Sequence, residues 1–283
     1  MNYTIFINGS RGIFVLKKLI KFKKYNLNAI VFCNKKIRKK INFSPKKVKK
    51  IFIKNINSKL SQKILKNLNS DIFLLAGYPQ ILKKKIFLLS KIMTINLHGG
   101  PLPNYRGGSP LNWQIIHGNK KIGISLIKIN TKIDGGKVID EKFFSLKENE
   151  DIKIAHKKAN NLFFRMLKTF FAKLSISKNE ISYIKKVRKS KYWKQRSDKD
   201  GNLNFKEKNS NQCINFIRAL TLPYPGAWIK YKTSKGNIIR LFKAKIIKES
   251  LERKKVILKK NLLLIPTKDK TIKITKFKLS KII

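Results

Sequence analysis

Short apolar runs that alternate with amphipathic stretches organise the first part of the chain. Residues 3–8 favour a strand, and after Gly9-Ser10-Arg11-Gly12 apolar residues recur at helical spacing. Residues 29–33 form a second apolar run. A strand, a glycine turn, a helix and a strand in this order predict a βαβ unit, which favours a parallel sheet.

The same alternation continues to about residue 175. Further strands are predicted at residues 51–53, 71–77, 93–98 and 122–129, and further helices at residues 60–68, 86–89, 111–117 and 154–174. Strands that alternate with helices predict an α/β domain with an open, doubly wound, mainly parallel sheet. Such sheets build their sites at the carboxyl ends of the strands.

The pattern changes after about residue 175, where a polar and charged stretch begins. A short helix is predicted at 211–219, followed by β-rich runs at 227–231, 238–246, 256–258, 262–265 and 271–274. Several short strands without helical period indicate a small β-barrel or sandwich. We therefore expect a large domain over residues 1–180, a linker over 181–210 and a small β domain over 211–283.

The charge of the chain is unusual for this pattern. Its 283 residues include 67 Lys and Arg against 14 Asp and Glu, a formal charge of +53, while hydrophobic residues make up an ordinary 42%. One interpretation is a surface that binds nucleic acid. The other, which we favour, is codon composition, because Lys, Ile and Asn are abundant together and Lys is spread along the whole chain.

The cysteines, the histidines and the apolar runs of the chain exclude several classes of protein. Cys33 and Cys213 are far apart, and the three histidines lack ligand spacing, so neither a disulfide framework nor a metal site is expected. The first residues read as a strand and not as a signal peptide, and no apolar run approaches the length of a membrane span. We expect a cytoplasmic protein without a membrane partner.

Three candidate catalytic residues lie at the ends of two predicted strands. Asn96 and His98 point to the same face of one strand, which ends at Gly99-Gly100, and Asp134 follows the strand at 122–129. A carboxamide can stabilise an oxyanion, and an imidazole can transfer protons. A carboxylate can hold the tautomer of the imidazole, raise its basicity or hold a relay water. These residue types suit acyl transfer without a covalent nucleophile. The alternative is that Asn96 and His98 only end a strand and that Asp134 is a loop acid.

A longer motif surrounds these residues and resembles the signature of the folate-dependent formyltransferase family. That family includes methionyl-tRNA formyltransferase, glycinamide ribonucleotide formyltransferase and the sugar N-formyltransferases. The resemblance rests on Asn96-Leu97-His98-Gly99-Gly100-Pro101-Leu102-Pro103-Asn104-Tyr105-Arg106-Gly107, Pro110-Leu111-Asn112-Trp113, Gly118, Gly123-Ile124-Ser125 and Asp134-Gly135-Gly136. It implies a Rossmann-like fold.

The resemblance also implies roles for individual residues. The catalytic residues of the family fall on Asn96, His98 and Asp134. Its donor, 10-formyltetrahydrofolate, is expected to contact Pro79, Gln80, Ile81, Leu82, Leu102, Pro103, Ile133, Gly135 and Gly136. The acceptor is expected near Gly9, Ser10, Tyr105 and Arg106, although Tyr105 and Arg106 can equally serve to hold the loop. No metal is implied.

The C-terminal part shows a further resemblance. Arg196-Ser197-Asp198-Lys199-Asp200-Gly201, Ile217-Arg218-Ala219-Leu220 and Pro223-Tyr224-Pro225-Gly226-Ala227-Trp228 resemble the second domain of methionyl-tRNA and aminoarabinose formyltransferases. That domain is a small open β-barrel, in line with the strand pattern.

The acceptor separates the branches of the family. Methionyl-tRNA formyltransferases carry a long Gly- and Arg-containing loop after the second strand, whereas residues 33–44 here are short, Lys-rich and without glycine. We therefore expect a nucleotide-linked amino sugar as acceptor, with tRNA as the alternative partner and a homodimer possible. A binder without activity and a formyl-folate hydrolase remain further hypotheses.

Overall fold

The computed structural model describes residues 1–22, 25–176, 181–187, 190–230, 237–247 and 255–281. The chain divides into two compact units. The first comprises Met1–Gly107, Gly123–Phe143 and Lys158–Tyr192, and the second comprises Gly108–Ile122, Phe144–Lys157 and Trp193–Ile283. The predicted limits at residues 180 and 210 stay a prediction.

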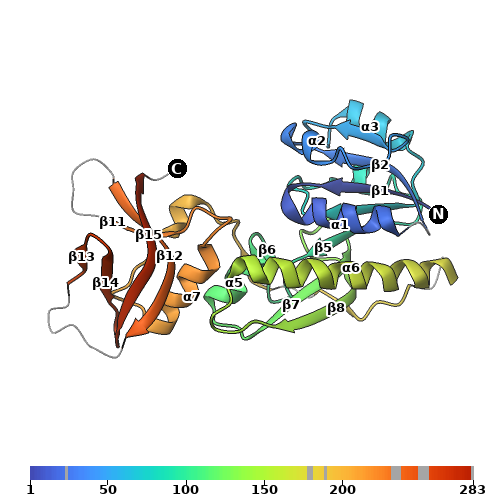
Figure 1. Ribbon diagram of the computed structural model, residues 1–283. Coiled ribbons are helices and arrows are strands. Elements are labelled where there is room, and N and C mark those ends of the chain that lie inside the picture. The colour runs from blue at the N-terminus through green and yellow to red at the C-terminus, as the bar shows by residue number, and fades with distance from the viewer. Residues whose placement is uncertain (23–24, 177–180, 188–189, 231–236, 248–254, 282–283) are drawn as a thin grey trace. The chain divides into compact units, whose positions relative to one another are not determined.

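The first unit is built on a sheet with the order β3-β2-β1-β4-β5-β7-β8-β9 (Figure 1). Its first half alternates strands and helices in this order: β1 (Asn2–Ile7), α1 (Gly9–Lys21), β2 (Asn26–Phe32), α2 (Lys36–Lys40), β3 (Lys49–Phe52), α3 (Lys59–Lys66), β4 (Ile72–Ala76), α4 (Lys84–Phe87) and β5 (Met93–His98). The pairs among β1 to β5 are parallel. The predicted mainly parallel α/β sheet is therefore confirmed.

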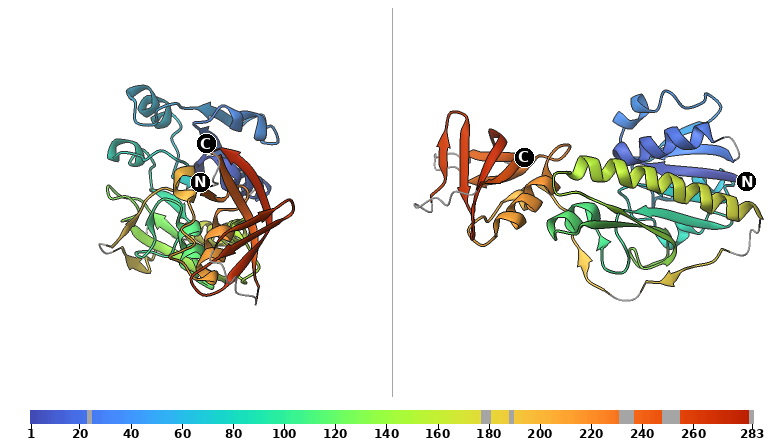
Figure 2. Two further views of the ribbon diagram at one scale, coloured as in Figure 1. Left: turned by 90° about the vertical axis from the view of Figure 1, so that its left-hand side faces the viewer. Right: turned by 60° about the horizontal axis from the view of Figure 1, so that its bottom comes forward.

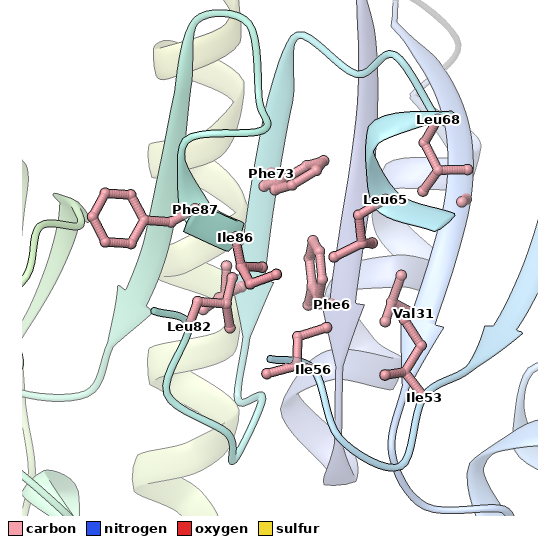
Figure 3. Packing of buried hydrophobic residues seen from close by; sticks show 12 residues of the cluster. Phe6, Val31, Ile53, Ile56, Leu65, Leu68, Phe73, Leu82, Ile86 and Phe87 are labelled. Carbon is pink, nitrogen blue, oxygen red and sulfur yellow. The ribbon is translucent and has the colours of Figure 1, made fainter. Parts of the chain in front are cut away.

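Side chains alternate between the two faces of this sheet. On one face Phe6 of β1 packs with Phe73 of β4, Leu65 of α3 and Ile86 of α4 (Figure 3). On the other face Tyr3 of β1 lies against Phe171, with the ring centroids 5.4 Å apart. Both faces of the strands are covered, which explains why their sequences read as continuous apolar runs.

Glycine-rich turns end several of these strands. The helix α1 begins at Gly9, whose φ of +60° lies in the left-handed region that favours glycine. A methyl group at Gly12 would lie 2.6 Å from Cβ of Ile7, so the helix approaches the strand closely. The predicted role of this segment as a tight strand-to-helix turn agrees with the structure.

Antiparallel pairs appear in the second half of the sheet. After β5 come β7 (Lys121–Lys128), β8 (Lys137–Ser145), α6 (Ile152–Ile176) and β9 (Lys185–Lys186), while β6 (Arg106–Gly107) lies outside this sheet. β7 runs antiparallel to β5, with His98 opposite Ser125. The strand β8 has no counterpart in the sequence-based prediction, because its exposed and buried positions do not alternate regularly. This strand contributes an acidic residue to the site.

The second unit holds an antiparallel sheet of five strands, coloured orange to red in Figure 2, with the order β11-β12-β15-β14-β13. Its elements are α5 (Pro110–Ile116), the 3-10 helix η1 (Asp198–Gly201), α7 (Ser210–Leu220), β11 (Ala227–Lys230), β12 (Asn237–Ile247), β13 (Ile257–Lys259), β14 (Leu262–Pro266) and β15 (Thr271–Lys281). The boundary between the units falls within β10 (Tyr192–Trp193). The predicted C-terminal β domain is confirmed, and β12 and β15 are longer than the sequence pattern indicates.

Candidate active site

His98 is the last residue of β5, so the sheet places it at the carboxyl edge of the parallel strands. Its side chain is buried, with 5% exposed. The ring atom Nε2 lies 2.6 Å from the carbonyl oxygen of Tyr105. Because a carbonyl oxygen only accepts, Nε2 carries a proton, and Nδ1 is the ring nitrogen that can gain and lose one.

Asp134 faces this second nitrogen. Its Oδ1 lies 3.5 Å from Nδ1 of His98, and its side chain is 11% exposed. Its Oδ2 accepts the backbone N–H of Gly107 at 2.9 Å. An imidazolium that forms at His98 is stabilised by this carboxylate. The roles expected for the carboxylate of Asp134 stay predictions, and the carbonyl of Tyr105 is a further group that holds the tautomer of the ring.

The turn that carries Asp134 is held by its own hydrogen bonds. Asp134 has φ of +46°, a left-handed conformation that Asp tolerates better than most residues. Nδ2 of Asn130 donates to the carbonyl of Gly135 at 2.9 Å. A methyl group at Gly136 would lie 1.8 Å from the carbonyl oxygen of Lys128, so only glycine fits there. These contacts fix the carboxylate relative to β7.

Asn96 lies two residues before His98 on β5 and therefore shares its face of the sheet. It is half-buried and pairs with Leu75 of β4 and Ile127 of β7 in the strand register. A carboxamide here can donate N–H to an oxygen that becomes negatively charged. The three predicted catalytic residues thus occupy one edge of the first unit, with His98 and Asp134 in direct contact.

Ser125 and Glu141 join this site without having been predicted for it. Oε1 of Glu141 accepts the backbone N–H of Leu102 at 3.1 Å and the hydroxyl of Ser125 at 3.1 Å. Glu141 lies on β8, the strand that the sequence pattern did not reveal. The available signal for Glu141 was the acidic pair Asp140-Glu141, which by itself indicates nothing specific, whereas Ser125 stood in the motif Gly123-Ile124-Ser125.

Comparisons with known proteins agree with this geometry. The family model "Formyl transferase" matches residues 7–163, and the model "Formyl transferase, C-terminal domain" matches residues 196–282. The chain belongs to the formyl transferase family.

Two curated relatives represent different members of this family. The chain is 34% identical over 282 residues to the bifunctional polymyxin resistance protein ArnA of Wigglesworthia glossinidia brevipalpis, covering 97% of this chain and 42% of that protein. It therefore spans less than half the length of that relative. It is 29% identical over 256 residues to the methionyl-tRNA formyltransferase of Finegoldia magna, covering 84% of this chain and 78% of that protein.

Solved structures share the fold of this formyl transferase. HypX from Aquifex aeolicus has a TM-score of 0.70 and 14% identity over 98% of this chain and 44% of its own. The methionyl-tRNA formyltransferase from Clostridium thermocellum has a TM-score of 0.64 and 20% identity over 99% of both chains. The N-formyltransferase from Helicobacter canadensis, in complex with folinic acid and dTDP-3-aminofucose, has a TM-score of 0.69 and 17% identity over 96% of this chain and 98% of its own.

The residues expected to contact the folate donor have different environments. Ile81 and Ile133 are large apolar side chains that are 62% and 40% exposed. Leu82 and Leu102 are instead buried in hydrophobic clusters. The side chain of Gln80 hydrogen-bonds the backbone of residues 54 and 56. Pro79 is exposed, Pro103 is half-buried and accepts a hydrogen bond from Ser190, and Gly135 and Gly136 form the turn after Asp134.

The residues expected near the acceptor lie at strand ends of the same unit. Gly9 and Ser10 are exposed at the start of α1. The ring of Tyr105 is largely buried, with 9% exposed, and its carbonyl meets His98. Nε and Nη2 of Arg106 donate to the carbonyl of Ile133 at 3.2 and 2.7 Å. These contacts help to hold the loop, and the expected contact of Tyr105 and Arg106 with an acceptor stays a prediction.

Neither a metal centre nor a membrane helix emerges from the described residues. Within them no group of three His, Cys, Asp or Glu side chains is placed to hold a metal ion. None of their helices is long and apolar enough to cross a membrane. Cys33 and Cys213 are free thiols, and burial raises the pKa of Cys213 to about 12.

Proposed function

We propose that this formyl transferase moves a formyl group from 10-formyltetrahydrofolate to the primary amine of a nucleotide-linked amino sugar. The observation that supports formyl transfer best is the contact of His98 Nδ1 with Asp134 at the carboxyl edge of the sheet, beside Asn96. An amide donor, an imidazole with one committed nitrogen and a carboxylate are the groups that acyl transfer to an amine requires.

The chemistry follows from these three residues. The amine nitrogen attacks the formyl carbon, and the carbonyl oxygen becomes an oxyanion that the carboxamide of Asn96 stabilises. Nδ1 of His98 accepts a proton from the attacking nitrogen, and Asp134 stabilises the imidazolium. When the bond between the formyl carbon and N10 of the folate breaks, His98 returns that proton to the leaving nitrogen.

The folate donor is supported by two observations. Ile81 and Ile133 present exposed apolar side chains on loops at the edge of the sheet that carries the site, and such side chains suit the flat rings of a pterin. The Helicobacter canadensis enzyme, which shares the fold, was crystallised with folinic acid, and HypX was crystallised with tetrahydrofolic acid. These complexes make a folate the first donor to test.

The choice of a sugar acceptor rests on the segment after β2. Residues 33–44 contain only the short helix α2, Lys36–Lys40, and no glycine. A segment this short offers little reach toward a large RNA. The fold is shared with an N-formyltransferase crystallised with dTDP-3-aminofucose, so a nucleotide diphosphate sugar is a suitable probe. Lys and Arg side chains can bind its diphosphate.

Methionyl-tRNA is the second candidate acceptor, and the charge of the chain favours it. A formal charge of +53 would attract the phosphates of any RNA. The Finegoldia magna relative, a methionyl-tRNA formyltransferase, also matches over 84% of this chain. A charge that follows from codon composition does not favour tRNA over a sugar nucleotide.

An acceptor competition tests the proposal. The purified protein is incubated with 10-formyltetrahydrofolate, a panel of nucleotide amino sugars and methionyl-tRNA, and every product is identified by mass spectrometry. We expect a formyl group on a sugar nucleotide, and we expect His98→Ala to abolish it.

Three other results of the acceptor competition would each point to a different function. A formyl group on methionyl-tRNA would replace the sugar with tRNA while keeping the chemistry. Rapid breakdown of the donor without any acceptor would identify a hydrolase. Folate binding with no turnover in any mixture would indicate a binder without activity.

A further inference from the structure

The loop that follows His98 is anchored at its start by a buried carboxylate. Glu141 of β8 has a side chain that is 11% exposed, and its Oε1 accepts the N–H of Leu102 at 3.1 Å. Its Oε2 accepts Nζ of Lys185 at 2.8 Å, which balances the negative charge. A carboxylate in this environment therefore has a partner on each oxygen.

Ser125 connects the same carboxylate to Gly100, two residues after His98. Ser125 is fully buried and lies opposite His98 in the β5–β7 register. Its hydroxyl lies 3.1 Å from Oε1 of Glu141 and 2.8 Å from the carbonyl oxygen of Gly100, and its one proton is shared between these acceptors. Glu141 and Ser125 thus hold residues 100–102 of the loop.

A short chain of contacts leads from this anchor to the imidazole. The N–H of Tyr105 donates to the carbonyl of Pro101 at 3.1 Å, which closes a turn directly after the anchored residues. The carbonyl of the same Tyr105 accepts Nε2–H of His98 at 2.6 Å. Leu102, the anchored residue, is also buried in a cluster with Ile127 and Val138. The position of the Tyr105 carbonyl therefore depends on where Leu102 is held.

We propose that Glu141 is a positioning residue for His98, which acts by fixing the loop so that the Tyr105 carbonyl holds the imidazole in its Nε2–H tautomer. Glu141 touches no reacting atom in this proposal. It keeps Nε2–H on the Tyr105 carbonyl and Nδ1 directed at Asp134, where the proton transfer of the proposed formyl transfer takes place. The expected effect on kcat rests on the proposed formyl transfer. The tautomer of His98 does not, because it can be observed without any substrate.

The role depends on an oxygen acceptor and not on a charge. In Glu141→Gln one oxygen still accepts the N–H of Leu102, whereas Glu141→Ala and Glu141→Leu remove the acceptor. Glu141→Leu preserves most of the volume of the side chain, so it serves if the alanine variant does not fold. Lys185→Ala removes only the partner of the other oxygen. Asp140→Asn, on the neighbouring residue of β8, is the matched control.

The first readout is the ring of His98 itself, measured without substrate. In 15N–1H NMR spectra optimised for imidazoles, the chain has only three histidines to assign. We expect a protected Nε2–H signal for His98 in the wild type, in Glu141→Gln and in both controls. We expect a mixture of tautomers or rapid exchange of that proton in the variants without an acceptor.

The second readout is steady-state formyl transfer with a nucleotide amino sugar. We expect kcat of Glu141→Ala or Glu141→Leu to fall about 10- to 100-fold, the size expected when a general base is misplaced, with little change in the KM of the acceptor. Glu141→Gln should stay within about threefold of the wild type, because a retained acceptor keeps the loop in place.

Two results would overturn the positioning role. A folded Glu141→Leu protein with the wild-type Nε2–H signal would show that the loop does not need this carboxylate. Unchanged kcat of the folded variants in an active wild-type background would show the same for catalysis. A wild-type enzyme that transfers no formyl group would refute the proposed function instead, and the NMR experiment would still decide the positioning role.

Discussion

Two pairs of oppositely disposed side chains, one in each unit, differ in how tightly they are bonded. In the second unit Arg240 and Asp198 are 4% and 8% exposed, and two N–H···O contacts of 2.7 Å join them. The remaining N–H groups of Arg240 reach Ser280 and the carbonyls of Pro225 and Lys281. In the first unit, His98 and Asp134 lie 3.5 Å apart, beyond an ordinary hydrogen bond.

This difference in bonding indicates a structural role for Arg240 and Asp198 and a reactive role for His98 and Asp134. Every donor of Arg240 has an acceptor, so any change of charge or position there is costly. The two ring nitrogens of His98 differ in their surroundings, because Nε2 is held by a carbonyl, whereas Nδ1 has a carboxylate nearby but is not tightly bonded to it. A group that must gain and lose a proton needs this looser arrangement.

The largest expected effect is on activity, at the looser pair. His98→Ala should lower kcat for formyl transfer by about 1,000-fold, because it removes the group that is placed to move the proton. Its melting temperature should fall by about 3–10 °C, because the change leaves a small cavity and removes the donor to the Tyr105 carbonyl. Steady-state rates measure the loss of activity, and calorimetry measures the melting temperature. A His98→Ala protein that does not fold would show that His98, like the Arg240–Asp198 pair, is needed for the structure.

The next effect is on stability, at the tighter pair. Asp198→Ala should destabilise the second unit by about 3–5 kcal/mol, because it leaves the guanidinium of Arg240 buried without its carboxylate. Urea unfolding, followed by tryptophan fluorescence, measures this change; of the three tryptophans, Trp228 reports on the pair, because its Nε1 donates to the carbonyl of Asp198. A loss below about 1 kcal/mol would mean that Arg240 finds other partners at little cost.

A smaller effect on activity should follow from Asp134→Asn. The amide oxygen can still accept the N–H of Gly107, so the turn is expected to remain, but the imidazolium at His98 loses its carboxylate. We expect kcat to fall about 10- to 100-fold with an unchanged fold, consistent with the loss of one charge interaction at a general base. Steady-state kinetics would measure kcat, and circular dichroism would check the fold. Full activity of Asp134→Asn would show that the proton transfer does not depend on this carboxylate.

The smallest effect concerns an exposed pair. The hydrogen bond from Lys194, followed by the backbone N–H of Ser197, lowers the pKa of Asp200 to about 2. Because the folded pKa lies below the unfolded one, this carboxylate stabilises the fold above about pH 4, and the contribution is lost as pH falls toward 2. Lys194 is 68% exposed, and solvent screening limits the contribution to about 1 kcal/mol.

Unfolding in urea at a series of pH values checks this last expectation. The difference in free energy of unfolding between the wild type and Asp200→Asn should shrink from pH 7 to pH 3. Glu148→Gln is the control, because Glu148 is 85% exposed. A difference that does not change with pH would place the origin of the stabilisation elsewhere.

Much of the architecture could be predicted from local pattern alone. Strands such as β1 and β4 are continuous apolar runs because helices cover both faces, and glycines mark where they end. Asn96 and His98 could be placed on one face because side chains alternate along a strand. The strand β8 was missed, since its mixed burial follows no simple period.

The sequence by itself determined the order of the elements, the family resemblance and which polar residues stand at strand ends. Only the tertiary structure decided what those residues contact. Glu141 meets Leu102 across 39 residues, and Asp134 meets Gly107 across 27, and no local periodicity encodes such pairs. The tautomer of His98 likewise depends on a backbone carbonyl, a group that every residue carries and that only the path of the chain can bring to the ring.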